Sequence, residues 1–96
     1  MTAPKHLSEE SRKLFRQIAA TVELDAQAET LLRGALEQWD RAQAARALVT
    51  AEGLVIDGKR HPALEIEKSA YRLALSFFRE LGLDPPAPLG RPSKSL

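Results

Sequence analysis

Few residues of this chain could perform acid–base or nucleophilic chemistry. The 96 residues include two histidines, His6 and His61, and no cysteine, which excludes thiolate nucleophiles, thiolate metal ligands and disulfides. Neither a phosphate-binding glycine loop nor an HExxH motif is present. Glu65 and Glu67 project to different faces of a helix, so they cannot flank one bond. A lone histidine beside a turn, such as His61, is more often a capping residue than a base. The sequence therefore predicts no enzyme, no metal site and no cofactor.

Basic side chains offer a clearer possibility, which is contact with phosphates. Arg12, Lys13 and Arg16 gather on one side of an expected amphipathic helix, opposite its apolar stripe. Such a face could bind nucleic acid, although three cations on a solvated face are also ordinary. The net charge of +1 is too small to decide between the two.

Three helices are expected to position these residues. Ser8 and Asp25 are good N-caps, and apolar periodicity predicts helices over residues 8–21, 25–51 and 62–81. Gly82 is expected to close the third helix as a left-handed residue, with Leu83 folding back as in a Schellman motif. The expected fold is mainly α, with a short N-terminal helix followed by a long antiparallel helical hairpin.

Residues 50–62 join the two long helices and predict a small β-hairpin. Gly53 can end the incoming helix, and Asp57-Gly58 suits a two-residue turn in which both residues have positive φ. Pro62 suits the first position of the next helix. The connection therefore forces the two long helices to lie side by side.

The apolar arc of the third helix is too wide for one partner helix to cover. The third helix has an arc of roughly 200°, so it needs either the first helix or a second subunit as a further neighbour. Leu48 projects on the wet side of the second helix, where a neighbouring copy could cover it. The predicted oligomer interface draws on both arcs: Leu36, Trp39, Leu48, Leu73 and Phe77.

Two charged residues interrupt these arcs. Arg46 and Glu67 project into the apolar faces of adjacent helices at nearly the same level. We expect them to form an ion pair, within a subunit or across a subunit boundary, because a lone buried charge costs several kcal/mol. The alternative is that Arg46 extends its guanidinium to solvent and Glu67 lies at an exposed helix start.

The two ends of the chain have a different character. Residues 1–7 are expected to be a mobile lead, and residues 84–96 an extended or disordered tail rich in proline. The domain is accordingly expected to span residues 1–83. Neither a membrane span nor a signal peptide is visible, so we expect a cytosolic protein without a membrane partner.

Four parts of the chain occur in a recognisable order: Pro4, Leu7 and Ser8, the helical hairpin whose connection begins at Gly53, HPALEIEKSA, and the closing ELGLDPP. Together they resemble phage terminase small subunits of the P27 type, which are related to those of HK97-like phages. Relatives commonly begin the third helix with Asn-Pro, whereas this chain has His61 before Pro62. Where they commonly have Ser, Ser and Arg, this chain has Pro86, Ala87 and Pro88.

The resemblance implies a role without catalysis. Such subunits recognise viral double-stranded DNA, assemble into rings of many subunits, and deliver DNA to a large terminase subunit that holds the ATPase and nuclease. They act in the host cytoplasm and are not expected in the mature virion. From the resemblance to these subunits we expect Arg12, Lys13 and Arg16 to contact DNA. The expected helpers are Lys5, Arg91 and Lys94, with Lys59 and Arg60 as second choices.

Two other functions fit the same residues. One is a small helix-turn-helix regulator, since residues 22–25 make a turn of about the right length, although the second helix exposes no obvious cluster that could read bases. The other is a helical adaptor that binds only protein, through the hydrophobic hairpin and the proline-rich tail.

Overall fold

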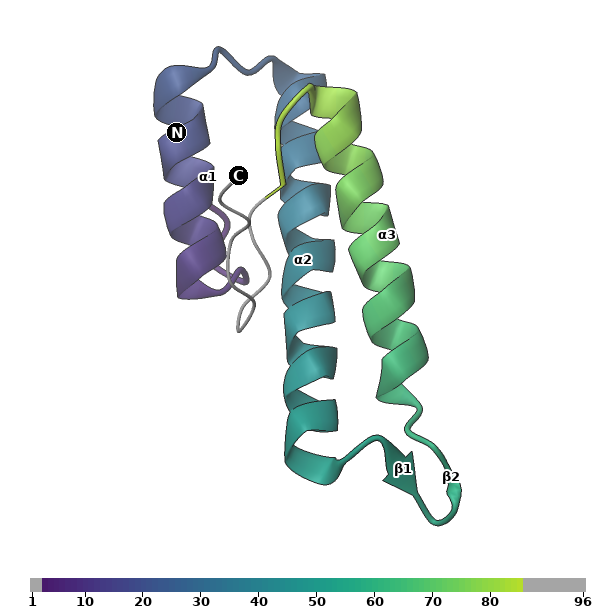
Figure 1. Ribbon diagram of the computed structural model, residues 1–96. Coiled ribbons are helices and arrows are strands. Elements are labelled where there is room, and N and C mark those ends of the chain that lie inside the picture. Colours follow the sequence, from purple (N-terminus) through teal and green to yellow (C-terminus); the bar gives the residue numbers. More distant parts are fainter. Residues whose placement is uncertain (1–2, 86–96) are drawn as a thin grey trace, which may run out of the picture.

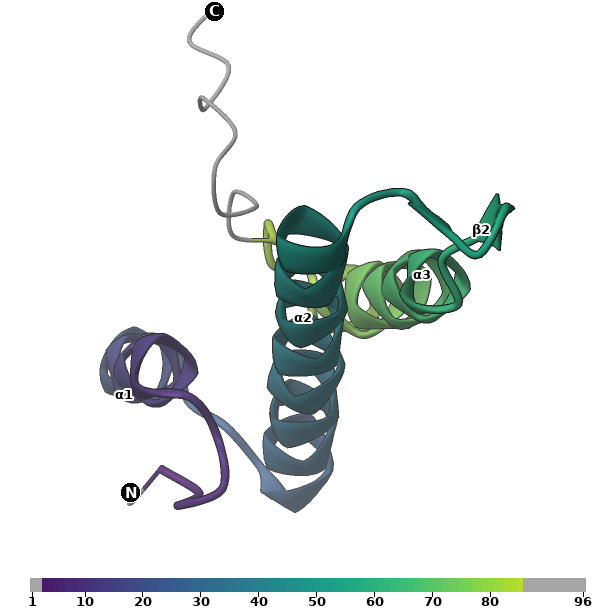
Figure 2. The same cartoon turned by 90° about the horizontal axis from the view of Figure 1, so that it is seen from below.

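The computed structural model describes residues 3–85 and confirms the mainly helical fold. The long helices α2 and α3 form an antiparallel pair, and α1 packs beside the half of α2 that lies far from the β-hairpin (Figure 1). Seen from below, α1 and α3 lie on different sides of α2, which makes α2 the central element (Figure 2). The elements are, in chain order, α1 Glu9–Thr21, α2 Ala26–Glu52, β1 Val55–Ile56, β2 Lys59–Arg60 and α3 Ala63–Leu81.

The predicted caps are formed. The side chain of Ser8 accepts a hydrogen bond from the Ser11 amide, and that of Asp25 accepts one from the Ala28 amide at 2.7 Å. At the end of α3, Gly82 has φ 72°, and the Leu83 amide donates to the Phe78 carbonyl at 3.0 Å. The Gly82 amide also donates to the Arg79 carbonyl at 3.0 Å. The two bonds at the end of α3 make a Schellman motif and satisfy carbonyls that the helix leaves free.

The β-hairpin also follows the prediction. Asp57 and Gly58 have φ of 51° and 73°, the left-handed conformations that a type I′ turn requires. Val55 pairs with Arg60 and Ile56 with Lys59 in antiparallel register. The hairpin is exposed over most of its length and extends the molecule beyond the ends of the helices (Figure 1).

The core lies where all three helices meet. Phe15 from α1, Leu32 and Leu36 from α2, and Phe78 from α3 are fully buried in one cluster. Each such side chain contributes about 1.5–3 kcal/mol through removal from water. A smaller cluster of Ala45, Val49 and Ala63 closes the other end of the helical hairpin. Because α1 is short, it covers α2 only at the first of these clusters.

The prediction of a mobile lead is wrong for the residues that the structure describes. Ala3 and Leu7 are buried in the main cluster, with 7% and 4% of their surfaces exposed. The Leu7 amide donates to the Pro4 carbonyl, and this turn folds the lead back against the helices. Two apolar side chains are thereby removed from water, which offsets the entropy of ordering the segment. Of the predicted tail, residues 86–96 lie outside the described part.

Candidate nucleic-acid interface

A basic surface runs along α1, formed by Arg12, Lys13 and Arg16; we call it the basic face. Lys13 and Arg16 are exposed and Arg12 is half-buried, while Leu14, Phe15 and Ile18 of the same helix turn toward the core. None of the three cations forms an ion pair with another residue in the range 3–85. Their charges are therefore available to a ligand, and Lys5 is exposed in the segment just before the helix.

A polar cluster fixes the start of α1 to the middle of α2. The Asp40 carboxylate accepts hydrogen bonds from the Ser8 amide at 2.7 Å, the Ser8 hydroxyl at 2.8 Å and the buried Ser11 hydroxyl at 2.6 Å. Ser8 thus caps its own helix and is held by the next one. We call Ser8, Ser11 and Asp40 the latch.

A second contact reinforces this attachment. The His6 Nε2 lies 2.5 Å from the Glu37 carboxylate, one turn before Asp40 on α2. Sequence reasoning found neither contact, because the partners are about 30 residues apart and no spacing rule relates them. The orientation of the basic face depends on these polar contacts together with the packing of Leu7 and Phe15.

The second basic group lies at the far end of the molecule. Lys59 and Arg60 are exposed on β2, remote from α1 (Figure 1), and Arg60 lies 4.0 Å from the Glu65 carboxylate. A contact this long between exposed groups is weak. The other expected helpers, Arg91 and Lys94, fall outside the described residues.

His61 joins the end of α2 to the start of α3. It is 6% exposed, its Nδ1 accepts a hydrogen bond from the Ala63 amide at 2.9 Å, and its Nε2 lies 2.8 Å from the Glu52 carboxylate. The nitrogen that accepts a backbone N–H carries no proton, so Nε2–H donates to Glu52. His61 is therefore a capping residue, as the sequence predicted, and its two nitrogens are already occupied.

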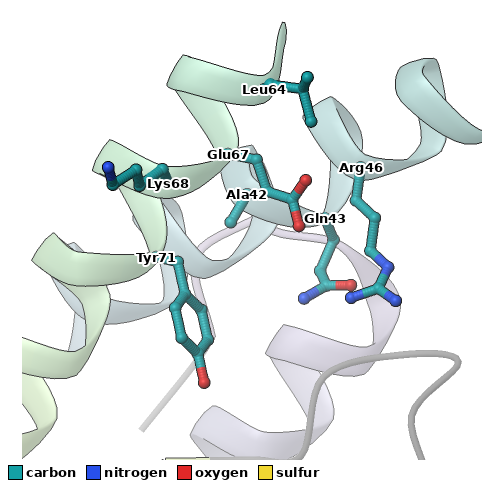
Figure 3. A pocket seen from close by; sticks show the side chains of 7 residues that line it. All are labelled: Ala42, Gln43, Arg46, Leu64, Glu67, Lys68 and Tyr71. Atoms are coloured by element: carbon teal, nitrogen blue, oxygen red, sulfur yellow. The ribbon is translucent and has the colours of Figure 1, made fainter. Parts of the chain in front are cut away.

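Arg46 and Glu67 lie at the same level but do not pair within the chain. Both line a pocket of about 210 Å³ between α2 and α3, together with Ala42, Gln43, Leu64, Lys68 and Tyr71. Figure 3 shows the Glu67, Gln43 and Arg46 side chains directed into this space. The Arg46–Glu67 contact is absent from the ion pairs of residues 3–85, so the pairing stays a prediction only across a subunit boundary.

A model of one protein family covers most of this architecture. The family described as phage terminase, small subunit, matches residues 8–88, which include all three helices and the hairpin. The chain belongs to the phage terminase small subunit family. It therefore has a role in phage DNA packaging. No curated protein and no solved structure matches it.

The structure divides the predicted interface residues of the small subunit into two groups. Leu36 and Trp39 are 0% and 6% exposed, so within a single chain they belong to the core. They are covered because α1 and α3 approach α2 from two sides. Leu48 and Leu73 are 49% and 44% exposed, while Phe77 is half-buried. The interface prediction now rests on these three.

Residues 3–85 of the small subunit hold neither a membrane-spanning helix nor a cluster of metal ligands. Each helix in this range is too short or too polar to cross a membrane. No three His, Cys, Asp or Glu side chains in the same range are arranged to hold a metal ion.

Proposed function

We propose that this small subunit recognises viral double-stranded DNA and delivers it to the large terminase subunit, acting as a ring of many copies in the host cytoplasm. The large subunit would hold the ATPase and nuclease, and this chain would itself be non-catalytic. Membership of the phage terminase small subunit family supports the role in DNA packaging. The basic face of α1, which has no ion pair within residues 3–85, is the observation that supports DNA contact.

The basic face can act as a phosphate-binding surface when many copies assemble. One chain carries a formal charge of only +1, so a single copy attracts DNA weakly. A ring would repeat Arg12, Lys13 and Arg16 around its circumference and sum their fields. Binding built from phosphate contacts releases counterions and therefore weakens steeply as salt is raised.

The helix-turn-helix alternative gains no support from the arrangement of the helices. The face of α2 that packs on its neighbours is formed by Leu32, Ala35, Leu36, Trp39, Ala42, Ala45 and Val49. The exposed face carries Arg33, Glu37 and Arg41, which alternate in sign and make no cluster of Arg, Asn and Gln that could read bases.

The test compares two double charge reversals on the full chain. Lys13→Glu with Arg16→Glu alters the basic face, and Arg72→Glu with Arg79→Glu changes the same total charge on exposed positions of α3. Binding to viral DNA is followed by fluorescence anisotropy over a range of salt concentrations. The first variant should bind much more weakly, and its log–log salt slope should fall by about 0.9 for each phosphate that the protein no longer neutralises.

The control variant should retain most of the affinity and the original slope. Equal reductions in affinity in both variants would mean that only the overall charge matters, which would overturn the assignment to α1. Absence of any salt-sensitive DNA binding by the assembled wild-type protein would instead favour the adaptor function. Light scattering after size exclusion, at two salt concentrations, establishes the assembly state in which these measurements are made.

A further inference from the structure

The outer side of the α2–α3 pair carries an uncovered apolar surface. Ile66 and Leu73 of α3 are 41% and 44% exposed and line a shallow groove with Arg41 and Glu65. Leu48 follows Arg41 by seven residues, or about two turns of α2, so it projects to the same side. We call Leu48, Ile66 and Leu73 the stripe.

The pocket that contains Arg46 and Glu67 opens on the opposite side of the same two helices; we call it the socket. On α3 the socket residues Leu64 and Tyr71 are seven apart, and the stripe residues Ile66 and Leu73 repeat that spacing two positions later. Two residues correspond to a rotation of about 200° around a helix. One subunit therefore has exposed apolar side chains along a shallow groove on one face and a pocket on the other.

The dimensions of the socket suit an apolar side chain. Its volume of about 210 Å³ exceeds the cavity of about 150 Å³ that takes up benzene in an engineered core. Ala42, Leu64 and the ring of Tyr71 supply apolar walls. Tyr71 is itself held by Trp39, with ring centroids 5.8 Å apart, so this wall is fixed before anything binds.

Charges at the edges of the two surfaces are complementary. The socket presents two cations, Arg46 and Lys68, and one anion, Glu67, and none of the three has an ion-pair partner among residues 3–85. The groove along the stripe presents Glu65 and Arg41. Covering the socket would remove its three charges from water, which is costly unless opposite charges from the other surface meet them.

We propose that the stripe of one copy enters the socket of the next, so that the ring closes through a head-to-tail contact. This inference rests on the ring assembly proposed above and names the surfaces that form it. A closed ring needs two different surfaces on each subunit, whereas a two-fold dimer needs one surface that meets itself. The stripe and the socket are different and lie on opposite faces, so they can make a head-to-tail contact, which forms a ring where the rotation between neighbours closes.

The experiment blocks each surface in a separate full-length variant. Leu73→Asp places a charge on the stripe, and Glu67→Arg fills the socket and adds a third cation to Arg46 and Lys68. Ile66→Asp serves as an independent stripe variant, and Arg72→Asp as the control on an exposed position of α3 between the two faces. Helical content by circular dichroism confirms that each variant is folded before its mass is measured by light scattering.

The proposal predicts a specific pattern of masses. Wild type and Arg72→Asp form the large assembly, whereas each of the other three variants alone is a monomer of 10.6 kDa. An equimolar mixture of Leu73→Asp and Glu67→Arg forms a dimer and nothing larger, because one intact stripe meets one intact socket and the remaining surfaces are both blocked.

Other outcomes would overturn the proposal in distinguishable ways. A wild-type monomer at all concentrations would contradict both the ring and the head-to-tail contact. A wild-type ring with blocked variants that still assemble, or with no dimer in the mixture, would leave the proposed function intact and reject these two surfaces. A Glu67→Arg variant that forms dimers by itself would indicate a two-fold contact between stripes.

Discussion

At the scale of single residues, Asp40 and His61 each make several hydrogen bonds that join neighbouring elements. Asp40 accepts three hydrogen bonds from two serines at the start of α1. His61 caps α3 with one nitrogen and contacts the end of α2 with the other. Both residues connect elements that the backbone alone would leave free to move relative to one another.

The first prediction concerns the latch. Asp40→Ala should lower the free energy of unfolding by about 1–3 kcal/mol, because the buried Ser11 hydroxyl loses its acceptor on α2 and a charged group is removed. Glu37→Ala, which removes the exposed contact with His6, should cost less than about 1 kcal/mol. Urea unfolding at a fixed protein concentration measures both. Equal losses of unfolding free energy in the two variants would show that Asp40 contributes no more to stability than the exposed Glu37 contact.

The second prediction concerns the cap of α3. His61→Ala should cost about 1–2 kcal/mol through loss of the cap, whereas His61→Asn should recover most of this, since an amide oxygen can accept the same N–H. The resemblance noted in the sequence agrees, because relatives commonly have Asn-Pro at this position. Comparison of the two urea midpoints is the test, and an asparagine variant as unstable as the alanine variant would contradict the capping role.

At the scale of elements, the contact between α2 and α3 depends on one small residue. A Cβ atom at Gly34 would lie 3.3 Å from Phe77 Cε2, tighter than ordinary van der Waals contact. Gly34 therefore allows the half-buried Phe77 ring to lie against the backbone of α2. The periodicity of the segment contains no sign of this, since a glycine inside a helix predicts only weaker helix formation.

The third prediction tests that close approach. Gly34→Ala should change the free energy of unfolding by less than about 1 kcal/mol, because the gain in helix propensity and the tight contact oppose each other. Gly34→Leu should destabilise by about 1–3 kcal/mol, since the larger side chain forces Phe77 away. Ala47→Leu, at an exposed position of α2, should stay within about 0.5 kcal/mol of wild type. A leucine tolerated equally well at both positions would contradict the packing argument.

At the scale of the whole molecule, the two basic groups and the apolar surfaces are widely separated. The molecule measures 49 × 33 × 22 Å, with α1 beside the half of α2 that lies far from the hairpin and β2, which holds Lys59 and Arg60, at the hairpin end (Figure 1). The described part of a single chain also leaves Leu48, Ile66 and Leu73 partly in water. Association would bury these side chains and add stability that one small domain lacks.

The fourth prediction follows from this exposed surface. The midpoint of thermal unfolding should rise with protein concentration for the wild type, because association stabilises only the folded state. The same midpoint should be independent of concentration for Leu73→Asp, which is expected to remain monomeric. Circular dichroism melts across a hundredfold range of concentration measure both, and a wild-type midpoint that does not change would argue against assembly through folded subunits.

The helices, the hairpin and their ends follow from local features of the sequence. Ser8, Asp25 and Gly82 act through hydrogen bonds to residues a few positions away, and Asp57-Gly58 acts through its own φ values, so these features follow from local spacing. The same holds for the basic face of α1, because helical periodicity alone places it opposite the apolar side of that helix.

Which predicted side chains are covered and which charges meet depends on how the helices pack in three dimensions. Leu36 and Trp39 are buried because α1 and α3 both pack against α2, whereas helical projection of one segment cannot count its neighbours. Arg46 and Glu67 reach the same level, but a cavity separates them. The docking of residues 3–7 and the bonds to Asp40 join positions distant in the chain, and such contacts depend on how helices orient in space.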